Sequence, residues 1–281
     1  PYTEPSVVDG VAVASDDEGT KKWDEYMNQL TWDEMATIVS YGGFGQPAVE
    51  AIGKKQNGAY DAAAHPFWNG AMFGGAQAPE NQMGTNWVTP AVWGCTWNTE
   101  LLHDIGIMTG NEALLFNING LYGFSLNIHR SAFGGRNFEY LSEDPLLTGK
   151  MACAQLRGMH RWGVTGTIKH FATNNQEHRR HFVESVVSER ALREIYLRGF
   201  EIAVKEGHAR SIMTSYNPLN GYWTASNYDL VTTILRGQWC YTGIVMSDWW
   251  AEGNDRDGAG STKHVAAMVR AQNDVFMVVA V

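Results

Sequence analysis

Short apolar runs alternate with stretches of helical spacing from about residue 97 onward. The helical patterns cover residues 98–117, 143–160, 188–206, 227–236 and 263–272. The apolar runs are Tyr122–Ile128, Val164–Ile168, Ser211–Thr214, Gly243–Met246 and Val275–Val279. Strands that alternate with helices at this spacing favour βαβ units and a parallel sheet. Because the runs are continuous rather than alternating, we expect strands that are covered on both faces.

The first third of the chain is less regular. Residues 1–20 contain Pro, Asp, Gly and Ser without a helical period, and we assign residues 1–25 to an N-terminal linker segment. The sequence Thr31-Trp32-Asp33-Glu34 fits a capping box and predicts the start of a helix. Residues 41–95 are rich in Gly, Ala, Asn and Trp, and long irregular segments in compact domains are usually functional.

Polar and ionisable residues appear where four of the apolar runs end: Asn127, His129 and Arg130; Lys169 and His170; Ser215, Tyr216 and Asn217; and Ser247, Asp248 and Trp249. In a parallel (β/α)8 barrel the C-terminal strand ends converge on one mouth, which is where such barrels carry their chemistry. A doubly wound open sheet typically has a glycine-rich phosphate-binding turn, and neither common form of that motif is found here. We therefore predict a TIM-type (β/α)8 barrel, an α/β fold with parallel strands, over residues 26–281.

The composition argues against several classes of function. Hydrophobic residues make up 44% of the 281 positions, charged residues 18% and aromatic residues 12%, a mixture typical of a globular chain. The net charge of −9 argues against binding nucleic acid through its phosphates. No apolar run approaches the roughly 18 residues that cross a bilayer, so we expect no membrane span. The three cysteines form no C-x-x-C pair, so they indicate no zinc site.

The predicted barrel mouth collects one firm carboxylate among cations and aromatic rings. The candidates are Arg130, Lys169, His170, Glu177, Arg180, Tyr216 and Asp248, with Trp249 and Trp250 beside them. Such a set suits a neutral, hydroxyl-rich ligand such as a sugar, and a carboxylate there can attack an anomeric carbon. Spacing alone leaves other roles open: Asp248 as a helix N-cap, Lys169-His170 as a solvated loop pair, and the tryptophans as core residues.

Five separated motifs between about residues 97 and 260 resemble glycoside hydrolase family 3. They are Ser125-Leu126-Asn127-Ile128-His129-Arg130 with Gly134-Gly135-Arg136-Asn137-Phe138-Glu139-Tyr140 and Ser142-Glu143-Asp144-Pro145; Lys169-His170-Phe171-Ala172 with Asn174-Asn175-Gln176-Glu177; Ser188-Glu189-Arg190-Ala191-Leu192-Arg193-Glu194-Ile195-Tyr196; Met213-Thr214-Ser215-Tyr216-Asn217 with Asn220-Gly221; and Val245-Met246-Ser247-Asp248-Trp249. The resemblance implies a barrel with a sugar-cleaving site.

The resemblance also implies roles for individual residues. Asp248 matches the catalytic nucleophile, Tyr216 a tyrosine that contacts it, and Glu177 an acidic residue in a supporting role. The other matches are substrate-binding residues: Lys169 and His170 for sugar hydroxyls in the −1 subsite, Arg130 and Arg180 as further sugar-binding arginines, and Trp249 and Met213 as subsite walls. Asp61 is the nearest match to an aspartate that grips distal hydroxyls.

The sequence departs from the family in two places. The Asp-Gly-Pro of the first strand end is replaced by Asp61-Ala62-Ala63, and residues 60–85 fit the family poorly. The family's acid/base carboxylate commonly comes from a separate α/β sandwich domain, for which 281 residues leave no room. We therefore expect the barrel module of a larger glycoside hydrolase, resembling the subgroup in which the sandwich precedes the barrel. Its partners would be that companion domain and a β-glucoside or oligosaccharide.

The resulting expectation is a retaining exo-β-glycosidase, with β-glucosidase favoured, that works through a covalent glycosyl-Asp intermediate and needs no cofactor. The Lys-His-Phe-Ala-x-Asn-Asn sequence speaks against the N-acetylhexosaminidase branch of the family. The alternatives are a β-xylosidase or another exo-glycosidase, a non-catalytic sugar-binding barrel, and a barrel enzyme of unrelated chemistry such as a metal-dependent isomerase. The oligomeric state is open, a homo-oligomer included. The missing leader slightly favours a cytoplasmic location.

Overall fold

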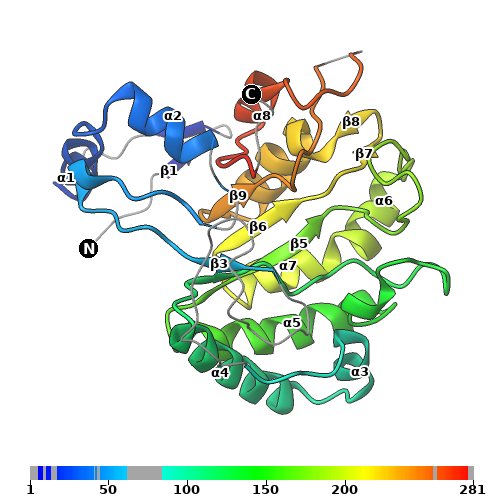
Figure 1. Ribbon diagram of the computed structural model, residues 1–281. Helices are drawn as coiled ribbons and strands as arrows, with labels where there is room; N and C mark the ends of the chain where they lie inside the picture. Colours follow the sequence, from blue (N-terminus) through cyan, green and yellow to red (C-terminus); the bar gives the residue numbers. More distant parts are fainter. Residues whose placement is uncertain are drawn as a thin grey trace.

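A parallel five-stranded sheet forms the centre of the molecule (Figure 1). The computed structural model describes residues 6–8, 11–13, 18–40, 42, 45–61, 84–255 and 258–277, with side chains from residue 21 on. The strands, in spatial order, are β3 (Ala59–Tyr60), β4 (Gly120–Leu121), β5 (Thr165–Phe171), β6 (Ser211–Thr214) and β9 (Ile244–Met246). A bridge from Met246 to Val275 extends the sheet beyond β9. The predicted parallel sheet is confirmed.

Helices that connect these strands pack side by side against one face of the sheet (Figure 1). They are α4 (Thr99–Leu115), α5 (Pro145–His160) and α7 (Arg198–Lys205), the last preceded by the short α6 (Glu189–Ala191) and the π-helix η4 (Leu192–Tyr196). Further along the chain lie the π-helix η6 (Asp229–Gln238) and α8 (Val265–Arg270). Each element falls on a predicted helical range, although the range 188–206 is divided into three pieces.

Of the described elements in the N-terminal part, the sequence pattern predicted only the helix that follows Thr31. An antiparallel pair, β1 (Ser6–Val8) and β2 (Val11–Val13), is followed by α1 (Glu18–Met27) and α2 (Trp32–Ser40). The predicted capping box at the start of α2 is confirmed, because the Thr31 N–H donates to Glu34 Oε2 (2.8 Å) and the Glu34 N–H to Thr31 Oγ1 (3.3 Å).

The remaining described elements are short and lie in the segments between the longer helices and strands. They are η1 (Glu50–Ile52), α3 (Pro90–Cys95), η3 (Asn137–Glu139), the hairpin of β7 (Pro218–Leu219) and β8 (Tyr222–Trp223), and η5 (Thr224–Ser226). Of the irregular region 60–85 singled out in the sequence, residues 62–83 lie outside the described residues. So do Val278 and Val279 at the end of the last predicted strand.

The main hydrophobic core lies between the sheet and its helices. Ile168 and Phe171 of β5 pack there with Leu156 of α5 and Phe200 of α7, and all four are fully buried. Burial of the helix-facing side of the sheet thus holds the strands in a common register, with their carboxyl ends together.

None of the described helices combines the length and hydrophobicity that crossing a bilayer requires.

Two strand boundaries differ from the predicted ones for a physical reason. The run Tyr122–Ile128 is not a continuous strand, because β4 ends at Leu121 and Phe124 adopts a positive φ of 70°. The chain then pairs through isolated bridges at Ser125, which joins it to both Tyr140 and Lys169. In contrast, β5 continues through Lys169 and His170, which are buried despite being ionisable. Their burial depends on contacts with other segments.

We expect Gly158→Ala to destabilise the fold even though alanine favours helices. A Cβ at Gly158 of α5 would come within 2.1 Å of the His103 carbonyl oxygen of α4, a backbone atom that cannot move aside alone. The free energy of unfolding should fall by about 1–3 kcal/mol, measured by urea denaturation.

Gly199→Ala on α7 is the matched control, because its nearest neighbour would be at 3.5 Å, an ordinary contact. It should leave stability unchanged or raise it by up to about 1 kcal/mol. Equal effects of the two substitutions would contradict close helix contact at Gly158.

Candidate active site

The carboxyl ends of the strands bring together residues that are far apart in the sequence. Asp248 lies two residues beyond β9, Tyr216 lies two residues beyond β6, and Asp61 directly follows β3. Lys169 and His170 lie in the last three residues of β5. Because parallel strands end at the same edge of a sheet, these five side chains lie at one end of the molecule, as the sequence predicted.

The Asp248 carboxylate is the buried centre of this cluster. Its side chain is 6% exposed, its Oδ1 accepts from the Trp249 N–H (2.8 Å), and its Oδ2 lies 3.7 Å from His170 Nε2. Oδ2 has no hydrogen-bond partner among the described residues. Burial raises the pKa of Asp248 to about 6, against the lowering effects of Arg136, the Trp249 N–H, Lys169 and Tyr216. The group is therefore mainly ionised at neutral pH.

His170 is held rigidly and stays neutral. The Asn127 side chain binds its backbone on both sides: Nδ2 donates to the His170 carbonyl and Oδ1 accepts from its N–H, each at 2.9 Å. Burial lowers the pKa of His170 well below its usual value, and Arg136, Lys169 and Arg180 act in the same direction. The ring nitrogen Nδ1 is buried and has no partner in the described part of the chain. A neutral imidazole can offer hydrogen bonds to a ligand hydroxyl.

Lys169 joins three segments of the chain. Its side chain is 2% exposed, and its Nζ donates to Asp61 Oδ1 (2.8 Å) and lies 3.9 Å from Glu139 Oε2. Asp61 is 39% exposed at the side chain, so the pair reaches from the buried sheet end towards solvent. The structure thus places the predicted residues Asp61 and Lys169 in direct contact.

Arg136 and Glu139 belong to the cluster although the sequence assigned them no role. Arg136 Nε bonds to the Glu139 carboxylate and lies 4.0 Å from Glu177 Oε1. Both residues occur in the Gly-Gly-Arg-Asn-Phe-Glu-Tyr motif that carries the family resemblance. Their place beside Lys169 depends on the fold of the loop, so the signal was present only as a motif.

Glu177, Arg180 and Tyr216 form the adjoining wall. Arg180 Nη1 donates to Glu177 Oε2 (3.1 Å), and the Arg180 guanidinium lies 4.4 Å from the centre of the Tyr216 ring. Burial and the negative charge of Asp248 raise the pKa of Tyr216, so its hydroxyl keeps its proton. Tyr216 is therefore in electrostatic contact with Asp248, and Arg180 and Glu177 follow it along the same wall.

Met213 belongs to a buried apolar cluster of the sheet, and Trp249, the residue after Asp248, packs against that cluster. Trp249 packs edge-on against Tyr122, with 5.3 Å between ring centres, and Met213 lies in the same apolar cluster. Arg130 is placed differently: it is exposed, and its guanidinium lies 5.8 Å from the Tyr196 ring centre. The cations that act on the Asp248 pKa are Arg136 and Lys169. A sugar-binding role for Arg130 stays a prediction.

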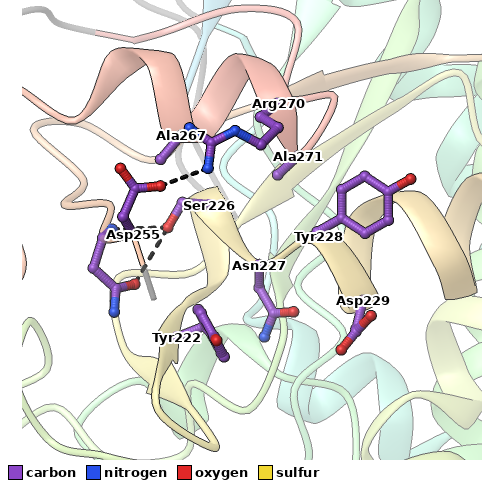
Figure 2. A pocket seen from close by; sticks show the side chains of 10 residues that line it. Tyr222, Ser226, Asn227, Tyr228, Asp229, Asp255, Ala267, Arg270 and Ala271 are labelled. Atoms are coloured by element: carbon purple, nitrogen blue, oxygen red, sulfur yellow. Dashed lines mark hydrogen bonds and ion pairs between the residues drawn. The ribbon is translucent and has the colours of Figure 1, made fainter. Parts of the chain in front are cut away.

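Two other hollows lie away from this cluster. A cavity of about 300 Å³ lies at the amino ends of the strands, where Gly120, Thr165 and Ser211 line it. Figure 2 shows a pocket of about 220 Å³ beside α8, in which Arg270 donates to Asp255 (2.6 Å) and Ser226 Oγ accepts from the Asn254 N–H (2.9 Å). Four of its polar lining residues are thus bonded to one another in pairs. Across the described residues, no three His, Cys, Asp or Glu side chains are grouped to hold a metal ion.

A TIM-type barrel has the features described here: parallel strands connected by helices, with ionisable side chains gathered at the carboxyl ends of the strands. The model of the family described as "Glycosyl hydrolase family 3 N terminal domain" matches residues 71–281. The chain belongs to glycosyl hydrolase family 3. Both the predicted family and the predicted TIM-type barrel class are confirmed.

Similar proteins include several β-glucosidases. A β-glucosidase of Ruminococcus albus is 57% identical over 185 residues, which are 66% of this chain and 20% of that protein. A β-glucosidase of Rhizobium radiobacter is 37% identical over 81% of this chain and 27% of its own length.

Solved structures of β-glucosidases have the same fold. That from Paenibacillus barengoltzii has a TM-score of 0.80 at 45% identity, covering 90% of this chain and 28% of its own. β-Glucosidase 3B from Thermotoga neapolitana in complex with glucose has a TM-score of 0.80 at 36% identity, covering 91% of this chain and 36% of its own. The chain therefore spans only about a fifth to a third of these relatives.

We expect Asn127→Ala to lower the free energy of unfolding by about 2–4 kcal/mol. The substitution leaves the buried N–H and carbonyl groups of His170 without the two hydrogen bonds that Asn127 makes. Asn175→Ala removes one bond, to the Ile128 carbonyl (2.7 Å), and should cost about 1 kcal/mol. Urea denaturation measures the free energy of unfolding of both variants. Equal decreases would contradict the pair of hydrogen bonds between Asn127 and the His170 backbone.

We expect Asp248→Asn to be more stable than the unsubstituted protein at pH 7, by up to about 3 kcal/mol. The folded-state pKa of about 6 lies above the ordinary 3.8, so the folded state binds more protons than the unfolded state between these values. Raising the pH from about 4 to about 6 therefore costs the unsubstituted protein stability that the amide variant does not lose. Denaturation at pH 4, 5, 6 and 7 measures this, and a pH-independent difference would contradict it.

Proposed function

We propose that the protein is a retaining exo-β-glycosidase, and specifically a β-glucosidase, with Asp248 as its nucleophile. The observation that carries the proposal is the buried Asp248 carboxylate, whose Oδ2 has no hydrogen-bond partner among the described residues while two cations act on it. An ionised carboxylate with a free oxygen is the group that attacks an anomeric carbon. The names of the similar β-glucosidases, and the glucose complex of the Thermotoga enzyme, support glucose as the sugar.

In the proposed reaction Asp248 Oδ2 forms a bond to the anomeric carbon as the glycosidic oxygen departs with a proton from an acid group. Water then attacks the same carbon, gives a proton to that group, and releases the sugar and the Asp248 carboxylate. Lys169, His170, Asp61 and Arg180 would bind sugar hydroxyls, and Trp249 and Met213 would form apolar walls. Tyr216 and Glu177 would hold the surroundings of the nucleophile, and the exposed Arg130 would meet more distant parts of the substrate.

The reaction needs a second carboxyl group about 5–5.5 Å from the nucleophile. Among the described acidic residues near Asp248, Glu139 and Glu177 are each bonded to an arginine and are poorly placed to serve as a free acid. We assign the acid/base to a companion α/β sandwich domain, consistent with the share of the relatives' length that this chain spans. Residues 26–281 would then be the barrel domain and residues 1–25 a linker.

The test is intact mass spectrometry of the longest native form of the protein after incubation with a 2-deoxy-2-fluoro-β-glucoside that has a good leaving group. The fluorine slows release of the glycosyl-enzyme, and the leaving group needs little acid assistance. We expect a mass increase of one fluoroglucosyl unit, mapped to the peptide that contains Asp248 and absent in Asp248→Asn.

A parallel incubation with the corresponding fluoroxyloside distinguishes the sugars. Faster labelling by the xyloside would overturn the assignment of glucose in favour of a β-xylosidase. No labelling by either reagent, together with glucose binding in calorimetry, would overturn the enzymatic role and leave a sugar-binding barrel.

A further inference from the structure

Glu139 is a buried carboxylate that the proposed reaction does not use. It ends the turn η3 on the loop between β4 and α5, and its side chain is only 4% exposed. Its Oε2 accepts from Ser125 Oγ (2.7 Å) and lies 3.9 Å from Lys169 Nζ, while Oε1 accepts from Arg136 Nε. One carboxylate thus contacts both cations that act on Asp248.

These contacts hold the Glu139 side chain in place more firmly than the contacts of an ion pair on the surface would. Burial opposes its ionisation, but Lys169 and Arg136 together hold the pKa of Glu139 below its usual value, so it is charged. A buried ion pair of this kind keeps its geometry because breaking it leaves an uncompensated charge out of water. The Ser125 hydroxyl donates to Glu139 Oε2 and so orients the carboxylate further. Ser125 is itself paired with Lys169 through a backbone bridge.

Glu177 does not duplicate this role. Its side chain is 27% exposed and lies 4.0 Å from Arg136 Nε, and its closer contact is with Arg180, whose Nη1 donates to Glu177 Oε2 (3.1 Å). Among the described residues, the other carboxylate within 4.0 Å of Lys169 Nζ is that of Asp61, which lies on the solvent side of the pair. Glu139 is therefore the inner anchor of Lys169 and Arg136.

We propose that Glu139 is a positioning residue that sets the direction of the Lys169 ammonium and the Arg136 guanidinium at the sugar-binding mouth. The inference rests on the proposed function, which assigns Lys169 to the binding of sugar hydroxyls, and it adds Arg136 to that set. Glu139 touches no substrate in this role. It acts by holding two donors in the geometry that the transition state needs.

The experiment measures the second-order rate of labelling by the fluoroglucoside in the longest native form of the protein. Glu139→Gln should lower this rate about 10- to 100-fold, as loss of a group that orients active-site ligands typically does. Glu139→Asp should recover part of it, because the charge is kept. Glu201→Gln is the control: its carboxylate bonds to Arg198 and Lys205 on the outer helix α7, and the rate should not change.

A double variant separates positioning from general support of the fold. If Glu139 acts largely through Lys169, the effect of Glu139→Gln should be several-fold smaller in a Lys169→Met background. Arg136→Met is the complementary background, and the same factor for Glu139→Gln in all three backgrounds would overturn the proposal. Should Glu139→Gln fail to fold, Ser125→Ala removes only the bond that orients Glu139, and we expect a loss of about 2- to 10-fold.

The two proposals can fail separately. Absence of labelling in the unsubstituted protein contradicts the proposed function. Normal labelling of the unsubstituted protein with an unchanged rate in both Glu139→Gln and Ser125→Ala overturns only the role of Glu139.

Discussion

The buried ammonium of Lys169 is the constraint on which the site depends. An ammonium group removed from water costs several kcal/mol unless opposite charges lie beside it. Its compensating carboxylates come from the end of β3 (Asp61) and from the loop before α5 (Glu139). The sheet end is consequently held by charge as well as by apolar packing, and three segments that are separate in the sequence are fixed relative to one another.

The same cations have opposite consequences for the two titratable groups at the centre. Burial favours the neutral form of both Asp248 and His170. Arg136 and Lys169 favour a negative carboxylate and disfavour a positive imidazole. The carboxylate can therefore be charged at neutral pH while the histidine beside it stays neutral. One electrostatic environment thus gives the two groups different charge states, as the proposed roles of Asp248 and His170 require.

Most of the fold was predictable from the sequence because α4, α5 and the strands β5, β6 and β9 show their periodicity locally. The two-residue strands β3 and β4 are too short to show a pattern, and their pairing partners define them. The end of β5 was missed since Lys169 and His170 interrupt an apolar run, and only distant carboxylates and the Asn127 side chain explain their burial. Arg136 and Glu139 were missed for a similar reason: the loop that carries them takes its direction from bridges at Ser125 and Tyr140.

The contact between Asp61 and Lys169 spans 108 positions along the chain. Closing a loop of that length has an entropic cost that must be met before the contact forms, so such contacts tend to form late on the folding pathway. Helices such as α4 and α5 can form from local interactions well before this. During refolding, the recovery of helical signal and the recovery of the charged mouth at the carboxyl strand ends should therefore be separate events. The mouth reports completion of the sheet, since it has all its charged partners only when the first strand has joined the others.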